Sequence, residues 1–265
     1  MTANTTLPVL KPTDMLERLI PAELAFARFN ALRTTDADSP AGIRRGANEA
    51  FEYLVDPTRP ASTYYNRAVG RSIDSLSGAS LDTLPPSIAA LEVTPALLTP
   101  EGAQRLHERG FRPAYALCYL GVSPVPAMPV ERDVARLSPL QVEHFFDLLE
   151  LQGVKLSPEK RARTSSHYCT EWFQAYVARG SDGAVTGWAT MFVDDGVAFL
   201  GNSFTLPQFR RTGAHRALLA ARLDRAAASG LDVAFTDVEH GSQSHRNCEY
   251  AGFRTVAVNT IWRRA

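Results

Sequence analysis

The chain contains 265 residues, of which 45% are hydrophobic and 21% are charged. These values are ordinary for globular proteins, and the length suits about two domains or one large one. Lysine and arginine together number 28, as do aspartate and glutamate, so the formal net charge is zero. A zero net charge disfavours a general polyanion-binding protein, and we expect no nucleic-acid partner.

Neither a membrane span nor a secretory signal is predicted. The sequence has no uninterrupted apolar window of about 18 residues, and its start lacks a basic segment followed by an apolar run. The cysteines Cys118, Cys169 and Cys248 are widely spaced and make neither a disulfide framework nor a zinc motif. We therefore expect a reduced, cytoplasmic protein with no metal site and no membrane partner.

The first half of the chain predicts a mixed set of elements. Residues 1–12 form a polar, flexible tail, and an amphipathic helix begins near Thr13. Thr99-Pro100-Glu101 is a strong helix start, because it combines a capping hydroxyl with proline at the first position. The other elements expected here are short helices within 47–53 and 85–91 and strands over 64–69, 91–93 and 111–122.

The second half follows a proline-rich stretch, 123–129, which reads as a stiff linker. Ser138 and Gln141 form a capping box before a helix, and Asp194-Asp195-Gly196 predicts a tight hairpin turn. The strands expected here are 130–137, 173–178, 185–193, 198–205, 231–238 and 253–262, with helices over 211–229 and 242–251. The predicted domains are 13–122 and 130–265.

The segment 203–216 carries the clearest chemical signal. It runs from a strand through a basic loop into a helix, and the first amides of a helix have no intrahelical acceptor. Gly213 lets an anion approach the backbone, and Arg210, Arg211 and Arg216 add positive charge. The sequence predicts an anion-binding loop, with an ordinary helix start as the alternative interpretation.

Residues 207–219, PQFRRTGAHRALL, resemble motif A of the GNAT superfamily of CoA-dependent N-acyltransferases. Ser244-x-x-Asn247 and Gly252-Phe253 resemble the superfamily's second CoA-contacting helix and its closing pair. The resemblance covers about residues 130–264. It implies an α/β (α+β) fold of two lobes, with a mixed, mainly antiparallel and splayed sheet flanked by helices, and acetyl-CoA as cosubstrate.

The resemblance also implies where acetyl-CoA lies. It would enter a V-shaped opening between strands 198–205 and 231–238, with its pyrophosphate on the backbone amides that start the helix. The residues implied to bind it are Phe204, Thr205, Arg210, Arg211, Thr212, Gly213, Ala214, His215, Arg216, Ser244 and Asn247.

Two positions depart from the family's pattern. His215 stands where motif A ends in glycine or alanine. Cys248 stands where many members carry the tyrosine that protonates the departing thiolate. Tyr250 is two residues away and on a helix faces about 160° elsewhere. Cys248 is therefore a candidate general acid that the residues alone leave in doubt.

Candidate bases lie at the end of the strand beside the opening. Asp237 and Glu239 alternate onto one face, where either a catalytic or a merely surface role is open. Asn202 and Ser203 are candidates for shaping the acceptor site. Tyr64-Tyr65-Asn66 in the first half is a weaker candidate. Trp172, Trp188 and Trp262 are interpreted as core residues.

A short internal echo suggests a duplicated unit. Residues 108–112, ERGFR, and 250–254, YAGFR, each end a short helix at glycine and open a terminal strand with phenylalanine. The junction 92–101, where we expect the first half's equivalent of the basic loop, is apolar and acidic instead. The first half is therefore predicted to be a degenerate, GNAT-like copy without CoA, with a helix-rich N-terminal domain as the alternative.

The predicted activity is transfer of an acetyl group from acetyl-CoA to a primary amine of a small molecule or amino acid, by direct transfer in a ternary complex. The alternative is an acyl-CoA-binding pseudoenzyme that acts as a sensor or interaction module. A monomer or a homodimer is expected.

Overall fold

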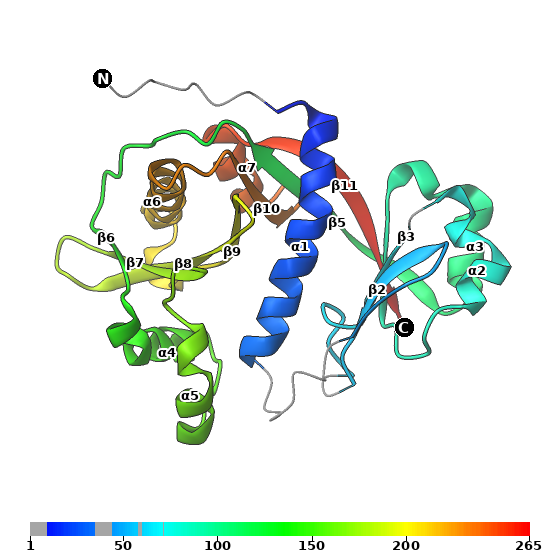
Figure 1. Cartoon of the computed structure of the whole chain (residues 1–265), viewed down its shortest axis with the longest axis horizontal. Helices are drawn as coiled ribbons and strands as arrows, with labels where there is room; N and C mark the ends of the chain where they lie inside the picture. The colour runs from blue at the N-terminus through cyan, green and yellow to red at the C-terminus, as the bar shows by residue number, and fades with distance from the viewer. Residues whose placement is uncertain (1–9, 35–43, 58–59, 71) are drawn as a thin grey trace. The chain divides into compact units, whose positions relative to one another are not determined.

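The computed structural model describes residues 10–34, 44–57, 60–70 and 72–265 (Figure 1). Contacts divide these residues into two compact units. Unit 1 contains Tyr119–Val256 and the described residues up to Phe26, and unit 2 contains the described part of Ala27–Cys118 together with Ala257–Ala265. Each unit is discontinuous in sequence, whereas the linker at 123–129 predicts contiguous domains.

Unit 1 is built on a mixed sheet. Its antiparallel strands are β6 (Val134–Arg136), β7 (Phe173–Arg179), β8 (Val185–Asp194) and β9 (Val197–Thr205). Strand β10 (Val233–Glu239) runs parallel to β9, and helix α6 (Ala214–Ala228) makes the crossover between them. The predicted fold class, a mixed and mainly antiparallel sheet flanked by helices, is confirmed.

Helices cover both faces of this sheet. Figure 1 shows α6 on one side of β7–β9, and α4 (Val142–Leu151) with α5 (Pro158–Thr164) on the other. The side chains of α4 reach the sheet through Phe145, whose ring meets that of Trp188 edge to face at 5.5 Å. Within unit 1, α1 (Pro12–Thr34) contributes Phe26, which stacks on Phe199 of β9 at 4.7 Å.

The strands of unit 2 repeat the same order of strand directions. Strands β1 (Arg44–Ala47), β2 (Phe51–Val55) and β3 (Arg67–Gly70) are antiparallel neighbours. Strand β4 (Ala90–Val93) is parallel to β3, and a 3₁₀ turn with helix α2 (Gly78–Asp82) joins them. Helix α3 (Pro100–Glu108) follows, as α7 (Gln243–Tyr250) follows β10 in unit 1.

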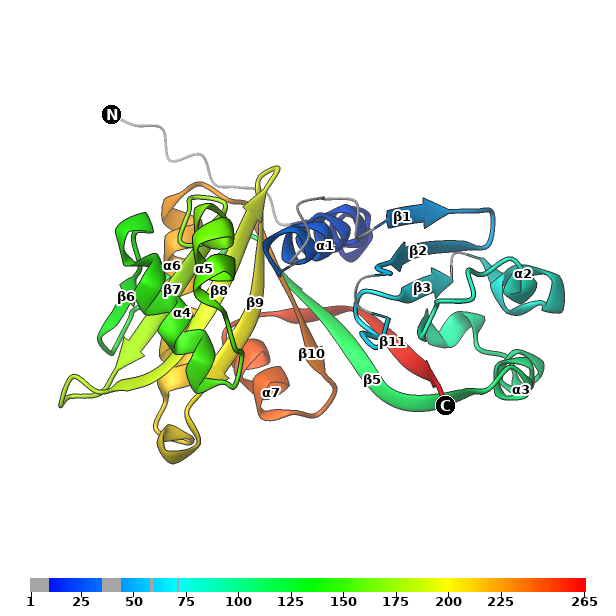
Figure 2. The same cartoon turned by 90° about the horizontal axis from the view of Figure 1, so that it is seen from below.

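The two units take their last strands from opposite halves of the sequence. Strand β11 (Arg254–Arg264), which follows α7, pairs with β4 of unit 2 through Thr260–Arg263. Strand β5 (Phe111–Val122), which follows α3, contributes Tyr119–Val122 to unit 1 as a neighbour of β10 (Figure 2). The matching order and this exchange support the predicted duplication. They also show that the counterpart of the α6 crossover is the segment between β3 and β4, and not the 92–101 junction.

Several local signals are confirmed. The Thr99 hydroxyl accepts a hydrogen bond from the Gly102 amide at 3.0 Å, with Pro100 at the first helical position. Ser138 and Gln141 form their capping box. Asp195 and Gly196 both have positive φ, 43° and 74°, as the predicted tight hairpin requires. Each of these signals is formed by residues a few positions apart, and the tertiary contacts leave it unchanged.

Two helices predicted in the first half are wrong. Residues 47–53 form the β1–β2 hairpin, because the Asn48 side chain accepts the amides of Ala50 and Phe51 and closes a turn, and β2 then pairs with β3. Residues 85–91 form a turn and the start of β4, whose first amides donate to the Asn66 carbonyl. Helix α5 was not predicted, although Ser157-Pro158 carries the same start signal as Thr99-Pro100.

Each unit has its own core of large side chains. In unit 1, Phe145, Phe173, Phe199 and Phe235 are fully buried, and in unit 2 Trp262 packs with Phe51, Ile88, Leu91, Leu106 and Phe111. Trp188 and Trp262 are core residues as predicted, but Trp172 is 64% exposed. Trp172 comes just before β7 begins and so escapes the alternation of that strand. None of the helices in the described segments is long and apolar enough to cross a membrane.

The role of β11 in unit 2 can be tested at Trp262. Replacing this tryptophan by alanine leaves a cavity in the core of unit 2 and should lower the unfolding free energy by about 3–5 kcal/mol. Urea unfolding followed by circular dichroism measures the change. The exposed Trp172→Ala variant is the matched control, and an equal effect of both substitutions would contradict the packing described here.

Candidate functional site

The basic loop between β9 and α6 has an unusual backbone. Arg211 has φ +64° and Gly213 has φ +91°, both in the left-handed region. The Thr212 hydroxyl donates to the Phe209 carbonyl at 2.7 Å and holds the loop closed. Helix α6 therefore begins at Ala214 and not at Arg211 as predicted, because Gly213 adopts a conformation that a right-handed helix excludes.

Three backbone amides at the start of α6 have no acceptor in the described part of the chain. The first intrahelical bond runs from the Ala217 amide to the Gly213 carbonyl at 3.0 Å. The amides of Ala214, His215 and Arg216 precede it, and the glycine at the N-cap has no side chain to accept from them. Together with the positive end of the helix dipole, they form a site suited to an anion.

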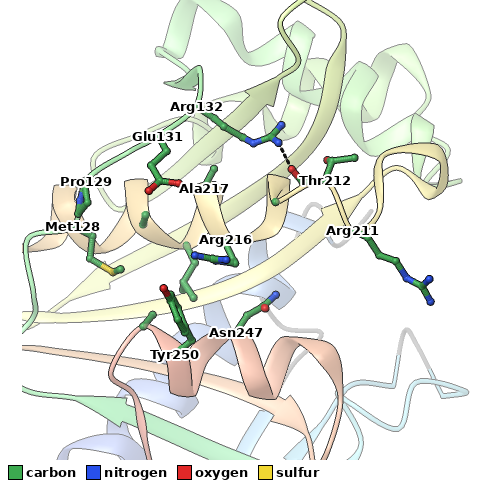
Figure 3. Close-up of a pocket in the computed structure, with 14 residues that line it drawn as sticks. Met128, Pro129, Glu131, Arg132, Arg211, Thr212, Arg216, Ala217, Asn247 and Tyr250 are labelled. Carbon is green, nitrogen blue, oxygen red and sulfur yellow. Dashed lines mark hydrogen bonds between the residues drawn. The ribbon is translucent and has the colours of Figure 1, made fainter.

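A cavity of about 460 Å³ opens beside these amides. It is lined by the 211–213 loop, one side of α6, the end of α7, and Met128, Pro129, Glu131 and Arg132. Arg132, Arg211 and Arg216 border it with one acidic residue, Glu131. Figure 3 shows Arg216 directed between the two helices, whereas Arg211 points outwards. The volume of the cavity is in the range of small-molecule binding sites.

Arg132 supports the loop from a distant part of the sequence. Its guanidinium donates to the Thr212 carbonyl. A Cβ atom added at Gly213 would lie only 3.4 Å from the Arg132 Nε atom. Position 213 favours glycine because of its φ angle, and Arg132 is its nearest neighbour. Sequence reasoning missed Arg132, because nothing in its local pattern links it to a loop 80 residues later.

The end of α7 places Tyr250, and not Cys248, beside the cavity. The Arg216 guanidinium lies 4.4 Å from the centre of the Tyr250 ring, which is 72% exposed. Cys248 is 2% exposed, and burial raises the pKa of its thiol to about 11. The two side chains face different sides of the helix, as their spacing predicts, and the thiol is protonated at neutral pH.

His215 links the two helices that flank the cavity. The Asn247 amide nitrogen donates to His215 Nδ1 at 2.9 Å, and the Ser244 hydroxyl lies 3.4 Å from Nε2. This pattern assigns the proton to Nε2. Burial, with a smaller effect from the Arg222 charge, lowers the pKa of His215 to about 4. Ser244 and Asn247, predicted to contact CoA, thus hold a neutral imidazole, although Asn247 also lines the cavity.

Strands β9 and β10 part close to this loop. Their parallel pairing covers only Val197–Phe199 with Val233–Phe235, after which the Thr236 hydroxyl donates to the Leu200 carbonyl at 2.7 Å. The pairing of β9 with β8 shifts in register beyond Gly201, and Asn202 there has φ +45°. This β-bulge leaves Asn202 and Ser203 exposed, with Phe204 and Thr205 half-buried beyond them.

Asp237 and Glu239 project from the face that α1 covers in unit 1. Phe235 pairs with Phe199, and paired residues of neighbouring strands share a face. Phe199 stacks on Phe26 of α1, so this face is the one away from α6. Asp237 is half-buried and Glu239 is exposed. The structure therefore brings both carboxylates to the mouth of the opening, on the side opposite α6.

Other predicted residues lie apart from this arrangement. Arg210 is exposed and is not one of the described residues that line the cavity. In unit 2 the Tyr64 and Tyr65 rings meet edge to face at 4.8 Å. Asn66 is fully buried, and its side chain accepts the Asp56 amide. These contacts favour a structural role for the Tyr64–Asn66 segment.

The shifted pKa of His215 makes stability depend on pH. Between its ordinary value near 6.5 and about 4, the unfolded chain binds a proton that the folded chain does not. The contribution of His215 to the unfolding free energy should therefore be complete above pH 6.5. It should fall by about 1 kcal/mol per pH unit as the pH drops toward 4. Urea titrations at several pH values should give a shallower pH dependence for His215→Gln. An unchanged slope would contradict the assignment.

Residues 142–253 match the model of the acetyltransferase (GNAT) family, and no curated protein matches the sequence. A GCN5-related N-acetyltransferase from Kribbella flavida has a TM-score of 0.59 at 18% identity, covering 92% of this chain and 95% of that one. A GCN5-related N-acetyltransferase from Sphaerobacter thermophilus has a TM-score of 0.57 at 16% identity, covering 97% and 96%.

A conserved protein of unknown function from Staphylococcus epidermidis has a TM-score of 0.56 at 9% identity, covering 88% of this chain and 99% of that one. At such identities these structures show the fold, which extends over both units. Residues 142–253 are a domain of the GNAT acetyltransferase family.

Proposed function

We propose that the protein transfers the acetyl group of acetyl-CoA to the primary amine of a small molecule or amino acid, by direct transfer in a ternary complex. The observation that carries this proposal is the set of three amides at Ala214–Arg216 that have no acceptor among the described residues. They lie beside a cation-lined cavity and next to the parted strands. Family membership supplies the reaction class. The acceptor is inferred from the chemistry of the opening.

The residues of the loop fit the pyrophosphate of CoA. The free amides and the guanidinium groups of Arg132 and Arg216 together offer hydrogen bonds and positive charge to a dianion. Among the described residues that line the cavity, Glu131 is the only acid, so positive charge dominates there. Gly213 keeps the approach to the backbone open, because it has no Cβ. Tyr250 adds a flat, exposed ring at the edge of the same cavity.

We assign stabilisation of the developing oxyanion to the Asn202 amide. The Leu200 carbonyl accepts from Thr236, on the β10 side, and the Gly201 carbonyl accepts from the Thr190 hydroxyl, on the β8 side. In a trans peptide the N–H points opposite to the carbonyl of the same unit. The Asn202 N–H is therefore directed to the β10 side, into the opening, where a donor can meet the acyl oxygen.

We assign the removal of the amine proton to the carboxylates of β10. Asp237 comes two residues after the last paired residue of β10, as Gly201 does in β9, and Glu239 lies further along the strand and is exposed. An amine that enters from the α1 face would meet Asp237 first and can lose its proton there directly or through water. A neutral amine is then free to attack the thioester carbon.

The thiolate that departs needs a proton, and Cys248 is a poor source of it. Its thiol is buried, and its pKa of about 11 leaves little driving force for donation. Solvent that reaches the opening is the simpler donor in this protein.

The alternative of an acyl-CoA-binding pseudoenzyme keeps one specific observation in its favour. His215 and the buried Cys248 replace residues that the family uses at the coenzyme, and His215 engages both Ser244 and Asn247. Both functions need the anion site, so CoA binding does not distinguish them. Turnover does.

Turnover is tested by release of free thiol from acetyl-CoA with a panel of small primary amines and amino acids, between about pH 6 and 9. We expect release well above the buffer rate with at least one acceptor. Tight CoA binding with no release across the whole panel would favour the pseudoenzyme and overturn the proposed transfer.

The anion site is tested by reversing two of its charges. Arg132→Glu together with Arg216→Glu should weaken CoA binding by about 100-fold or more, because carboxylates then face the pyrophosphate. Calorimetric titration with CoA measures the affinity. Arg254→Glu, an equal change per residue at an exposed position away from the cavity, is the control. Unchanged affinity of the double variant would mean that CoA binds elsewhere.

The role of Cys248 is tested by Cys248→Ala. If solvent protonates the thiolate, kcat should stay within a few-fold of the wild type, whereas loss of a general acid costs roughly 100-fold or more. Thermal unfolding of the same variant shows whether its packing is kept. A loss of the larger size in a folded variant would make Cys248 the acid.

A further inference from the structure

We propose that Arg222 and Thr190 are positioning residues for the acyl transfer: together they hold and polarise the peptide unit between Gly201 and Asn202, whose N–H meets the oxyanion. The inference rests on the proposed function, in which that amide is the oxyanion donor. Neither residue was singled out in the sequence, where Arg222 is one of several arginines on an alanine-rich helix.

Arg222 is a buried charge without a carboxylate. Its side chain is 2% exposed, and none of the ion pairs in the described part of the chain includes it. Burial lowers the pKa of its guanidinium to about 10, so it remains charged at neutral pH. Burying a cation is costly unless its hydrogen bonds are satisfied, so its partners indicate what it stabilises.

Those partners converge on the β9 bulge. Nε donates to the Leu218 carbonyl of its own helix at 3.0 Å. Nη1 crosses to the sheet and donates to the Thr190 carbonyl at 3.0 Å and to the Gly201 carbonyl at 3.5 Å. The register shift begins at this pair of residues, so the guanidinium bridges the two strands where their ladder is interrupted.

Thr190 reaches the same carbonyl oxygen. Its hydroxyl donates to Gly201 at 3.1 Å, and the residue is fully buried. The Gly201 oxygen thus accepts from one neutral and one charged donor. Hydrogen bonds to a carbonyl shift electron density away from the N–H of the same peptide unit, which strengthens that N–H as a donor. The affected N–H is that of Asn202. The same hydrogen bonds to the Gly201 carbonyl also fix the direction of this N–H toward β10.

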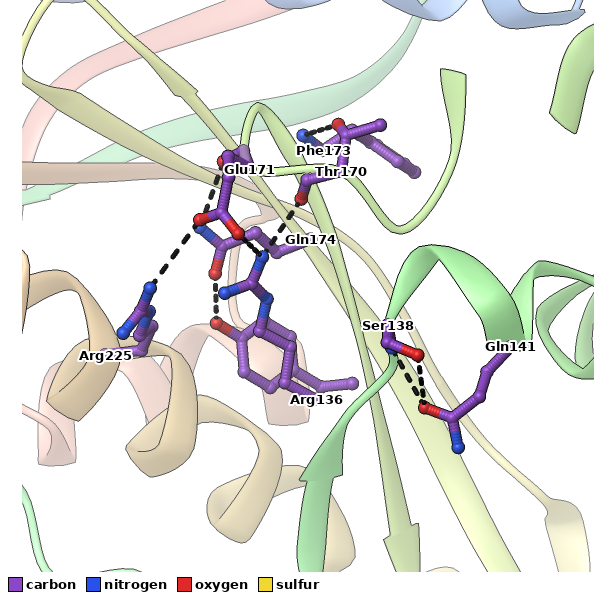
Figure 4. A network of polar contacts seen from close by, with 9 residues as sticks. Arg136, Ser138, Gln141, Thr170, Glu171, Phe173, Gln174 and Arg225 are labelled. Atoms are coloured by element: carbon purple, nitrogen blue, oxygen red, sulfur yellow. Dashed lines mark hydrogen bonds and ion pairs between the residues drawn. The ribbon is translucent and has the colours of Figure 1, made fainter. Parts of the chain in front are cut away.

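Arg225 provides the comparison on the same helix. It lies three residues along α6 and pairs with the Glu171 carboxylate at 3.6 Å. Figure 4 shows it at the edge of a network that also contains Arg136 and Gln174. This network joins α6 to the β6–β7 side of the sheet through charged partners and has no contact with the bulge. Arg225 therefore serves as the matched control for loss of a guanidinium from α6.

The experiment compares Arg222→Met and Thr190→Val with Arg225→Met in the full chain. We expect kcat to fall about 10-fold in each of the first two variants, less than the loss of an oxyanion donor itself, with the CoA dissociation constant and KM for the amine unchanged. Thr190→Ser, which keeps a hydroxyl, should recover most of the loss of Thr190→Val. Arg225→Met should keep the wild-type kcat.

A second readout does not depend on activity. In protein labelled with ¹⁵N at asparagine, the Asn202 amide resonance, assigned by its absence in Asn202→Ala, should move upfield in both Arg222→Met and Thr190→Val. It should stay in place in Arg225→Met. If Arg222→Met does not fold, Thr190→Val alone still tests the polarisation.

The outcomes separate the two proposals. Wild-type protein that releases no thiol overturns the proposed function, whereas the amide shift still reports on Arg222. Active wild type together with an unmoved Asn202 resonance and an unchanged kcat in folded Thr190→Val or Arg222→Met overturns the positioning role. A fall in thermal stability with kcat unchanged would make both residues structural only and would equally overturn it.

Discussion

The short parallel pairing between β9 and β10 is the constraint on which the rest of unit 1 depends. Three residue pairs join the strands, and beyond Phe199 and Phe235 each strand has to satisfy its backbone in another way. The Leu200 carbonyl accepts from the Thr236 hydroxyl of β10, and the Gly201 carbonyl accepts from Thr190 of β8 and from Arg222 of α6. In the proposed mechanism, this arrangement directs the Asn202 amide toward the opening. Buried polar groups need partners, and here the partners define the site.

The crossover between the same two strands explains why an anion site lies next to the opening. Helix α6 has to start near the end of β9, and Gly213 ends the loop in a left-handed conformation with no capping side chain. In unit 2 the crossover between β3 and β4 is different, because Ser77 caps α2 by accepting the Ser80 amide at 3.1 Å. A helix of five residues with a serine cap offers little to an anion. The physical difference between the two crossovers supports the interpretation of the first half as a degenerate copy.

Charge in unit 1 is divided between exposed and buried arginines with different tasks. Arg216 and Arg132 border the cavity, one against the Tyr250 ring and one against the Thr212 carbonyl, where they are available to an anionic ligand. Arg222 is enclosed and donates only to carbonyl groups. His215 lies between these regions and stays neutral because burial and the Arg222 charge both oppose its protonation. The balanced composition of the chain conceals this local ordering.

Local patterns in the sequence by themselves determined the elements whose causes are local. The Thr99 cap, the Asp195-Gly196 turn and the basic loop ending at Gly213 are set by residues a few positions apart, so their structure follows from the sequence. Only the tertiary structure decided the features that distant residues create. Pairing with β3 made a hairpin of a predicted helix, β11 joined β4, and Arg132 and Arg222 came to the loop and the bulge from far along the chain. Such contacts depend on which surfaces the folded strands and helices bring together, and no short sequence window contains that information.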